Sequence, residues 1–283
     1  MERQGMGGSG SFEDKASTLD AELKAVLSAG ADMVAVLGHV TGGASKDAVA
    51  GDSGEFAALD EIRLGLIERQ RSVHDRLALV VSGIAATIEK ERLNFDRREV
   101  PLRSDALIGF WSKKAMRRRI ERRALMAGDI ERLKTSLGRA DRLAGRIATQ
   151  RRNVMAQRAM AEALLDAIPR TRGGPDQMEG AGAGGVVQVA TLAASVVDTL
   201  NLGVRDLTLL LHKLTFDVER LLDHYAVLLS FRRDRDAHQL MADTYPYFGD
   251  AVARLAKDVL PGARLADSRR GIDLAFAERF SPG

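Results

Sequence analysis

The stretch 126-MAGDIERLKTSLGRADRLAGRIATQRRNVMAQRAMAEALLDAI-168 decides the fold. Alternating steps of four and three residues from its first methionine reach thirteen positions, eleven of which are apolar. They are Met126, Ile130, Leu133, Leu137, Ala140, Ala144, Ile147, Arg151, Val154, Arg158, Ala161, Leu165 and Ile168. A seam with this period over six heptads predicts a long helix that packs against a partner helix. Pro169 ends the helix, because proline lacks the backbone N–H that a helix interior needs.

The natural partner of this helix is the segment from Val186 to Phe231. One of its sides is lined by Ala193, Val196, Leu200, Leu207, Leu210, Leu214, Val218, Leu221, Tyr225 and Leu228, and further leucines lie on other sides. A helix that is apolar on several sides is central in its bundle. Between the two helices, residues 169–185 lack periodicity, so we interpret them as a flexible or functional loop. We therefore expect residues 126–168 and 186–231 to lie side by side and to run in opposite directions.

The rest of the chain is also predicted to be helical. Apolar residues recur at threes and fours over 18–38 and from Glu55 to Asp96, and short helices are expected at 247–259 and 265–279. The predicted fold is all-α, an elongated antiparallel helical bundle with coiled-coil-like long helices. Its expected parts are a disordered lead (1–16), the bundle (17–244) and short C-terminal helices packed on or near it (245–283).

Composition narrows the class of protein. Of 283 residues, 45% are hydrophobic and 29% are charged, with a formal net charge of +3 and no cysteine. Disulfides, thiolate catalysis and iron–sulfur clusters are therefore excluded. No run of about 18 purely apolar residues is present, so we expect no ordinary membrane span. The expected location is cytoplasmic, with peripheral association with a membrane as an extension.

The chain contains fragments of catalytic and cofactor-binding motifs, but it lacks the neighbouring elements that these motifs require. Gly180, Gly182 and Gly185 match G-x-G-x-x-G, but the preceding residues 170–179 cannot form the strand that a dinucleotide site needs. No Glu-x-x-His pair of the kind that holds metals in bundles occurs, and Asp234 with His238 is only one potential ligand pair. We therefore expect no catalytic residue, no metal site and no cofactor.

The antiparallel arrangement predicts two structural ion pairs. If Ile168 lies near Val186, Arg158 comes within a turn of Asp198, and Arg151 within a turn of Asp206. Such pairs fix register more than they add stability, because desolvation offsets most of the attraction. In the alternative, both arginines extend along the apolar surface and reach solvent.

The segment 110-FWSKKAMRRRIERR-123 contains the only tryptophan of the chain. Between residues 101 and 123, eight Lys and Arg side chains stand against two carboxylates. The same register arithmetic brings the basic run at 232–235 to this end of the bundle. The predicted basic tip consists of Trp111, Lys113, Lys114, Arg117, Arg118, Arg119, Arg122, Arg123, Arg232 and Arg233. A solvated helix end, an anionic membrane, an acidic protein and nucleic acid all remain open for it, with nucleic acid the weakest because one tryptophan gives little base stacking.

The sequence thus favours a non-enzymatic helical scaffold or interaction protein. Its expected partners are another protein, further copies of itself, or an anionic membrane surface bound by the basic tip. The alternative is a membrane-active protein, surface-remodelling or pore-forming, that uses the basic tip and the apolar segment 186–204. That segment carries one charge in nineteen residues, although an aspartate at the bilayer centre costs about 3 kcal/mol.

Overall fold

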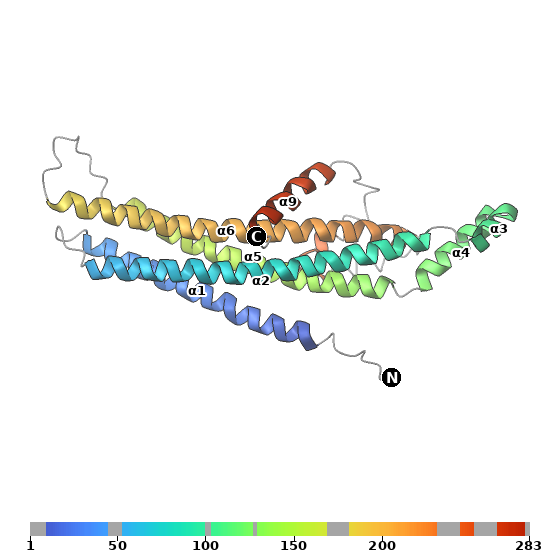
Figure 1. Cartoon of the computed structure of the whole chain (residues 1–283), viewed down its shortest axis with the longest axis horizontal. Coiled ribbons are helices and arrows are strands. Elements are labelled where there is room, and N and C mark those ends of the chain that lie inside the picture. Colours follow the sequence, from blue (N-terminus) through green and yellow to red (C-terminus); the bar gives the residue numbers. More distant parts are fainter. Residues whose placement is uncertain are drawn as a thin grey trace. The chain divides into compact units, whose positions relative to one another are not determined.

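The computed structural model describes residues 10–44, 53–99, 103–126, 129–168, 181–230, 244–251 and 265–280, which are helical almost throughout. They form an all-α helical bundle, as the sequence predicts (Figure 1), and contain no β-strand. The helices are α1 (Gly10–Ala44), α2 (Ser53–Glu99), α3 (Arg103–Trp111), α4 (Lys113–Met126), α5 (Asp129–Ala167), α6 (Ala181–Ser230) and α9 (Leu265–Phe280).

The first helix differs from the prediction at both ends. Helix α1 begins at Gly10, inside the lead that was expected to be disordered, and it continues to Ala44. The sequence interpretation ended this helix near residue 38, where the first glycine of a glycine-rich stretch stands. Val40 is nevertheless buried, so the apolar face of α1 continues past Gly38, and the helix continues with it.

Burial follows the predicted seams. Ten of the thirteen seam positions have side chains that the structure describes, and seven of these are buried. Six lie on α5, namely Leu137, Ala140, Ala144, Ile147, Val154 and Ala161, and the seventh is Ile168, directly after it. On α6 the buried positions include Ala193, Val196, Leu200, Leu207, Leu210, Leu214, Val218 and Leu221. The periodicity therefore identified the side chains that form the core, and their removal from water is the main favourable term in folding.

The chain divides into two compact units, and α2, α5 and α6 contribute to both. Unit 1 contains residues up to 76 and residues 149–208, and unit 2 contains residues 77–148 and 209 onward. The described residues 244–251 and α9 thus belong to unit 2.

Helix directions in unit 1 follow from long-range polar contacts. Gln150 Nε2 of α5 donates to the carbonyl of Leu23 at 3.2 Å, and Gln157 Nε2 donates to that of Leu27 at 2.8 Å. The bonded residues are 127 and 130 positions apart, so α1 and α5 run in the same direction. Glu22 of α1 pairs with Arg76 of α2, and these two residues are about equally far from the connection between their helices. Helices α1 and α2 are therefore antiparallel.

Helices α2 and α6 meet through a buried polar contact in unit 1. His74 Nδ1 lies 3.2 Å from Asp206 Oδ2, and both residues are buried. One turn earlier, the buried Gln70 lies against Gly203, where an added Cβ would come within 2.9 Å of its amide nitrogen. Because both contacts advance together along the two helices, α2 and α6 run in the same direction. It follows that α5 and α6 run in opposite directions, as predicted.

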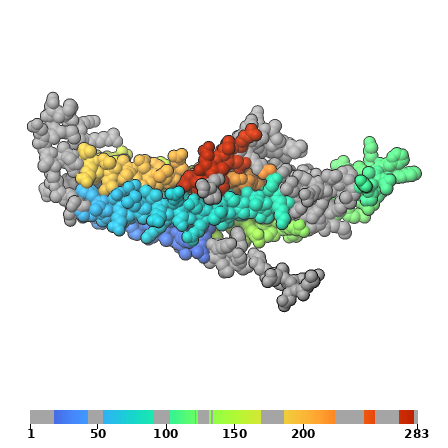
Figure 2. Space-filling view, in the orientation of Figure 1, coloured from blue at the N-terminus to red at the C-terminus, as the bar shows by residue number. Residues whose placement is uncertain are grey.

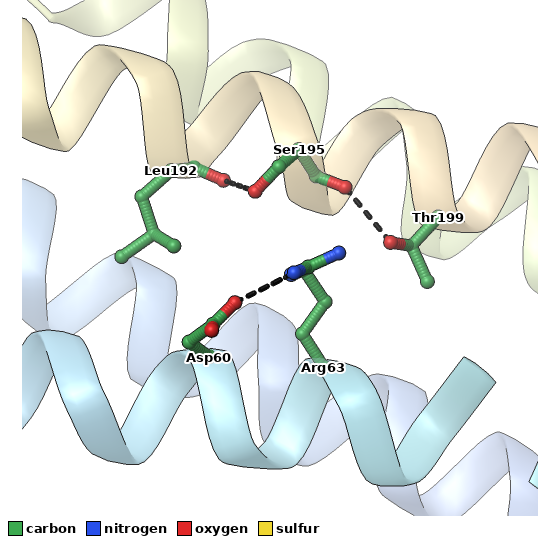
Figure 3. Close-up of polar contacts among 5 residues, drawn as sticks. All are labelled: Asp60, Arg63, Leu192, Ser195 and Thr199. Carbon is green, nitrogen blue, oxygen red and sulfur yellow. Dashed lines mark hydrogen bonds and ion pairs between the residues drawn. The ribbon is translucent and has the colours of Figure 1, made fainter. Parts of the chain in front are cut away.

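Other polar side chains of unit 1 are satisfied within their own helix. Ser195 Oγ donates to the carbonyl of Leu192, and Thr199 Oγ1 donates to that of Ser195, both at 2.8 Å. Arg63 of α2 bonds Asp60 Oδ1 at 2.7 Å while its guanidinium points toward α6 (Figure 3). Packing between α2 and α6 therefore does not require these groups to bond across the interface.

In unit 2 the segment around Tyr245 is fixed on α5. Both backbone N–H groups of Tyr247 and Phe248 donate to Asp141 Oδ1 at 2.9 Å, and the Tyr245 hydroxyl donates to the Lys134 carbonyl at 3.2 Å. Asp141, Tyr245 and Phe248 are buried. A single buried carboxylate thus satisfies two N–H groups of a turn, and that of Phe248 is buried.

One ion-pair cluster and one single ion pair join α6 to other helices of unit 2. Lys213 Nζ lies 2.8 Å from Asp217 on the same helix and 2.9 Å from Asp273 of α9. Arg220 Nη2 lies 3.1 Å from Glu89 of α2. The C-terminal helix α9 therefore packs on the bundle residues of its own unit.

The structure gives other partners to residues of the two predicted ion pairs. Arg158 Nε lies 3.0 Å from Glu162, one turn along α5, and Asp206 contacts His74. Arg151 is half-buried, with its Nε buried and without a hydrogen-bond partner among the described residues. Asp198 is exposed. The pairs Arg158–Asp198 and Arg151–Asp206 stay predictions.

We expect Leu207→Ala to lower the free energy of unfolding by about 2–5 kcal/mol, because Leu207 is fully buried and the change leaves a cavity. The matched control is Leu202→Ala on the same helix. Leu202 is 52% exposed, so this change should stay within about 0.5 kcal/mol. Urea unfolding followed by circular dichroism measures both. Equal losses in the two variants would contradict the assigned core face of α6.

Tyr245→Phe should change the response to alkaline pH. Burial raises the pKa of Tyr245, and the nearby carboxylates of Asp141 and Glu131 raise it further. The neutral phenol therefore favours the folded state below its ordinary pKa of about 10, and this contribution is lost as pH rises through the raised value. Near neutral pH the variant should lose about 1 kcal/mol with its hydrogen bond. The difference from the natural protein should narrow above about pH 10, whereas a constant difference would contradict the assignment. Urea unfolding across this pH range measures it.

Candidate interaction surface on α3 and α4

A one-residue break separates α3 from α4. Ser112 is not helical, yet its N–H donates to the Ile108 carbonyl at 2.8 Å and its own carbonyl accepts the N–H of Met116 at 3.0 Å. The Ser112 hydroxyl accepts the N–H of Ala115 at 3.2 Å, as an N-cap does. These three hydrogen bonds hold Ser112 between the two helices.

Helix α3 packs back on α4 to form the α3–α4 hairpin, residues 103–126. Asp105, fully buried, lies 3.3 Å from Arg119 Nε. Closer to the turn, a Cβ on Gly109 would come within 2.5 Å of Met116 Sδ, so the absence of a side chain at Gly109 allows close approach. These contacts pair residues on both sides of Ser112, which makes the two helices antiparallel.

Three large apolar side chains of α3 remain in solvent. Leu107 is 71% exposed, and Phe110 and Trp111 are each 87% exposed. The rings of Phe110 and Trp111 stand edge to face with centroids 6.1 Å apart. Exposed apolar groups that gather in this way indicate an interaction site.

Cationic side chains of the same hairpin, whose residues are green in Figure 2, are exposed as well. They are Arg103, Lys113, Lys114, Arg117, Arg118, Arg119 and Arg122. Arg119 also neutralises Asp105, and Arg117 has a further interaction within the protein. Lys114, Arg118 and Arg122 recur every four residues and so follow one face of α4.

Most of the predicted basic tip therefore lies on one element. Trp111 ends α3, and Lys113 to Arg122 belong to α4. Arg123 is also in α4, although its side chain, like Arg232 and Arg233, lies outside the described residues. Whether the run at 232–235 joins the hairpin stays a prediction.

Sequence reasoning missed the fold-back of α3. It treated 110–123 as the end of one rod and found no role for Asp105. The available signals were Gly109, Ser112 and a lone acid fourteen residues before Arg119. None of these is periodic, so a search for helical repeats does not detect them.

Metal sites and membrane-spanning stretches are two other kinds of functional feature that a helical protein can contain. No group of three or more His, Asp or Glu side chains is placed there to hold a metal ion. Thr18–Gly42 and Val186–Leu222 are long and apolar enough to cross a membrane by length and composition. Core helices of a bundle meet the same criterion, and both stretches contribute many buried residues to the core.

Comparisons with protein-family models, curated proteins and solved structures find no match to this chain.

The fluorescence of Trp111 provides a direct test of this surface. Because Trp111 is exposed and followed by Lys113 and Lys114, the ratio of iodide to caesium quenching should be higher for Trp111 than for the neutral reference N-acetyltryptophanamide. High salt should reduce the difference, since it screens exposed charges. Lys113→Glu with Lys114→Glu should lower the ratio below that of the reference. A ratio equal to that of the neutral reference at low salt would show that the tryptophan does not lie in a positive field.

Proposed function

We propose that this protein is a non-enzymatic helical interaction protein whose α3–α4 hairpin binds an anionic membrane surface. The observation that carries the proposal is the exposure of Leu107, Phe110 and Trp111 beside a set of exposed cations. Membrane-surface elements combine these two features, because apolar rings enter the headgroup region while Lys and Arg meet lipid phosphates. A cytoplasmic protein peripheral to the membrane fits this activity.

Charge alone gives a usable affinity. Each cation near an anionic bilayer contributes about 1 kcal/mol, and the hairpin presents several. Salt would screen this attraction, and the apolar side chains add a part that salt does not remove. An acidic protein could meet the same cations, but it would need its own apolar groove for the aromatic pair.

The polar side chains of the helices favour scaffolding over catalysis. Gln150, Gln157 and Asp141 each bond backbone groups of another segment, and His74 contacts Asp206. All of these contacts hold helices or turns in place. We therefore propose that the bundle is a frame that positions the hairpin, with long helical faces for a protein partner or for self-association.

A second candidate function is membrane insertion by the apolar part of α6. It rests on the stretch Val186–Leu222, which is apolar enough to span a bilayer. Against it, Asp206 and Asp217 are buried within this stretch and have partners in the folded units. Insertion would have to break these contacts in an environment where charge is costly. Release of a trapped dye from anionic vesicles would favour this second function.

Charge reversal tests the proposed function. We expect the full chain to sediment with vesicles of phosphatidylglycerol in phosphatidylcholine and to stay in solution with phosphatidylcholine alone. The variant with glutamate at positions 113, 114, 117, 118 and 122 should lose this binding, since each lost cation weakens it about fivefold.

The matched control reverses five exposed cations elsewhere: Lys24, Arg69, Arg71, Arg142 and Arg152. The net charge changes equally in the two variants, so only the location of the cations differs. The proposal would be wrong if the hairpin variant still bound the vesicles, or if the control variant lost as much binding as the hairpin variant. If the unaltered chain does not bind anionic vesicles but binds an acidic protein through the hairpin, the surface belongs to a protein partner.

A further inference from the structure

The apolar and cationic surfaces of the α3–α4 hairpin face in different directions. On α3, Leu107, Phe110 and Trp111 are spaced three and four residues apart and share one face. Asp105 and Gly109 share the opposite face, which contacts α4. At 3.6 residues per turn, the apolar face of α3 therefore points away from α4.

The cations of α4 likewise face away from the other helix of the hairpin. Met116 and Arg119, three residues apart, face α3. Lys114, Arg118 and Arg122 lie on the other side of the helix, away from α3. A flat membrane laid along the hairpin cannot contact both surfaces fully, since each faces outward from a different helix.

Arg103 lies four residues before Leu107, on the apolar face of α3. The other exposed cations of the hairpin meet the apolar side chains at the turn. Phe110 and Trp111 immediately precede Ser112, and Lys113 and Lys114 immediately follow it. All four flanking side chains are exposed. The hairpin turn, residues 110–114, therefore presents two aromatic rings and two ammonium groups within five consecutive residues.

The hairpin turn is also suited to an environment with little water. The Ser112 N–H, carbonyl and hydroxyl, and the N–H groups of Ala115 and Met116, are hydrogen-bonded within the hairpin. Unpaired backbone groups are what make loops costly in the apolar part of a bilayer. Each of these hydrogen bonds lowers the cost of bringing the turn near the acyl chains.

From these observations we infer that the hairpin enters the membrane turn first. Phe110 and Trp111 reach the boundary between headgroups and acyl chains, and Lys113 and Lys114 bind the phosphates around them. This inference rests on the proposed function and adds to it the depth and orientation of binding. The hairpin therefore binds the interfacial region of an anionic bilayer, which lies deeper than the charged headgroup surface.

Turn-first entry gives the cations an order of depth. Lys113 and Lys114 lie next to the aromatic pair, Arg118 is one turn further along α4, and Arg122 is two turns further. Their contributions to binding should fall in that order. If the hairpin lay flat on the surface, Lys114, Arg118 and Arg122 would contribute equally, because they share one face of α4.

Fluorescence of the full chain tests the depth, since Trp111 is its only tryptophan. Vesicles of phosphatidylglycerol in phosphatidylcholine should shift its emission to the blue and protect it from iodide. Lipids brominated high on the acyl chain should quench it more than lipids brominated near the chain end. Sedimentation of the same samples measures binding separately.

Paired variants test the orientation. Lys113→Gln with Lys114→Gln should weaken vesicle binding several-fold more than Arg118→Gln with Arg122→Gln, although each pair removes two charges. Phe110→Ala alone should reduce the blue shift and weaken binding, and Leu274→Ala on α9, also exposed, should change neither. Circular dichroism checks that each variant keeps its helices.

The outcomes separate the inference from the function on which it rests. Binding with an unshifted, iodide-accessible Trp111 would overturn turn-first insertion and leave surface binding intact. If the lysine pair and the arginine pair weaken binding equally, the hairpin lies flat on the membrane and does not enter turn first. Absence of binding to any anionic vesicle would remove the proposed function and the inference together.

Discussion

Removal of one apolar stripe per helix from water is the constraint on which the rest of the structure depends. The stripes on α5 and α6 contain most of the fully buried leucine, valine and alanine side chains. Burial of this kind is strong but non-directional. It forces the helices together and leaves their register and order to be fixed by other interactions.

Polar side chains inside the units supply that direction. Gln150 and Gln157 reach backbone carbonyls of α1, and His74 meets Asp206 between α2 and α6. A buried polar group is costly when it has no partner, so a slip of α5 along α1 would lose two such bonds at once. Apolar stripes therefore give cohesion to unit 1, and a few amides and one His–Asp contact select the register.

The α3–α4 hairpin differs from the long helices in which side chains it buries and which it exposes. Within α3 the residue that is buried is an aspartate, and the largest apolar side chains are in solvent. A folding requirement alone would place them the other way round. Here Asp105 and Gly109 hold α3 on α4, while the tryptophan and phenylalanine remain free for contact with a second surface. This inversion is the physical reason for proposing that the hairpin binds a second surface.

The sequence by itself determined the helical class, the core face of α5 and α6, and their opposite directions. These features are periodic or local, so spacing along the chain records them. Only the tertiary structure decided that α3 folds back on α4, that Arg158 pairs with Glu162, and that Asp206 contacts His74. Each of these depends on which of several charged side chains comes within a few ångströms of another. A rotation of a helix by part of a turn changes that outcome while leaving the apolar pattern intact, and for this reason the pattern predicts the bundle and not its ion pairs.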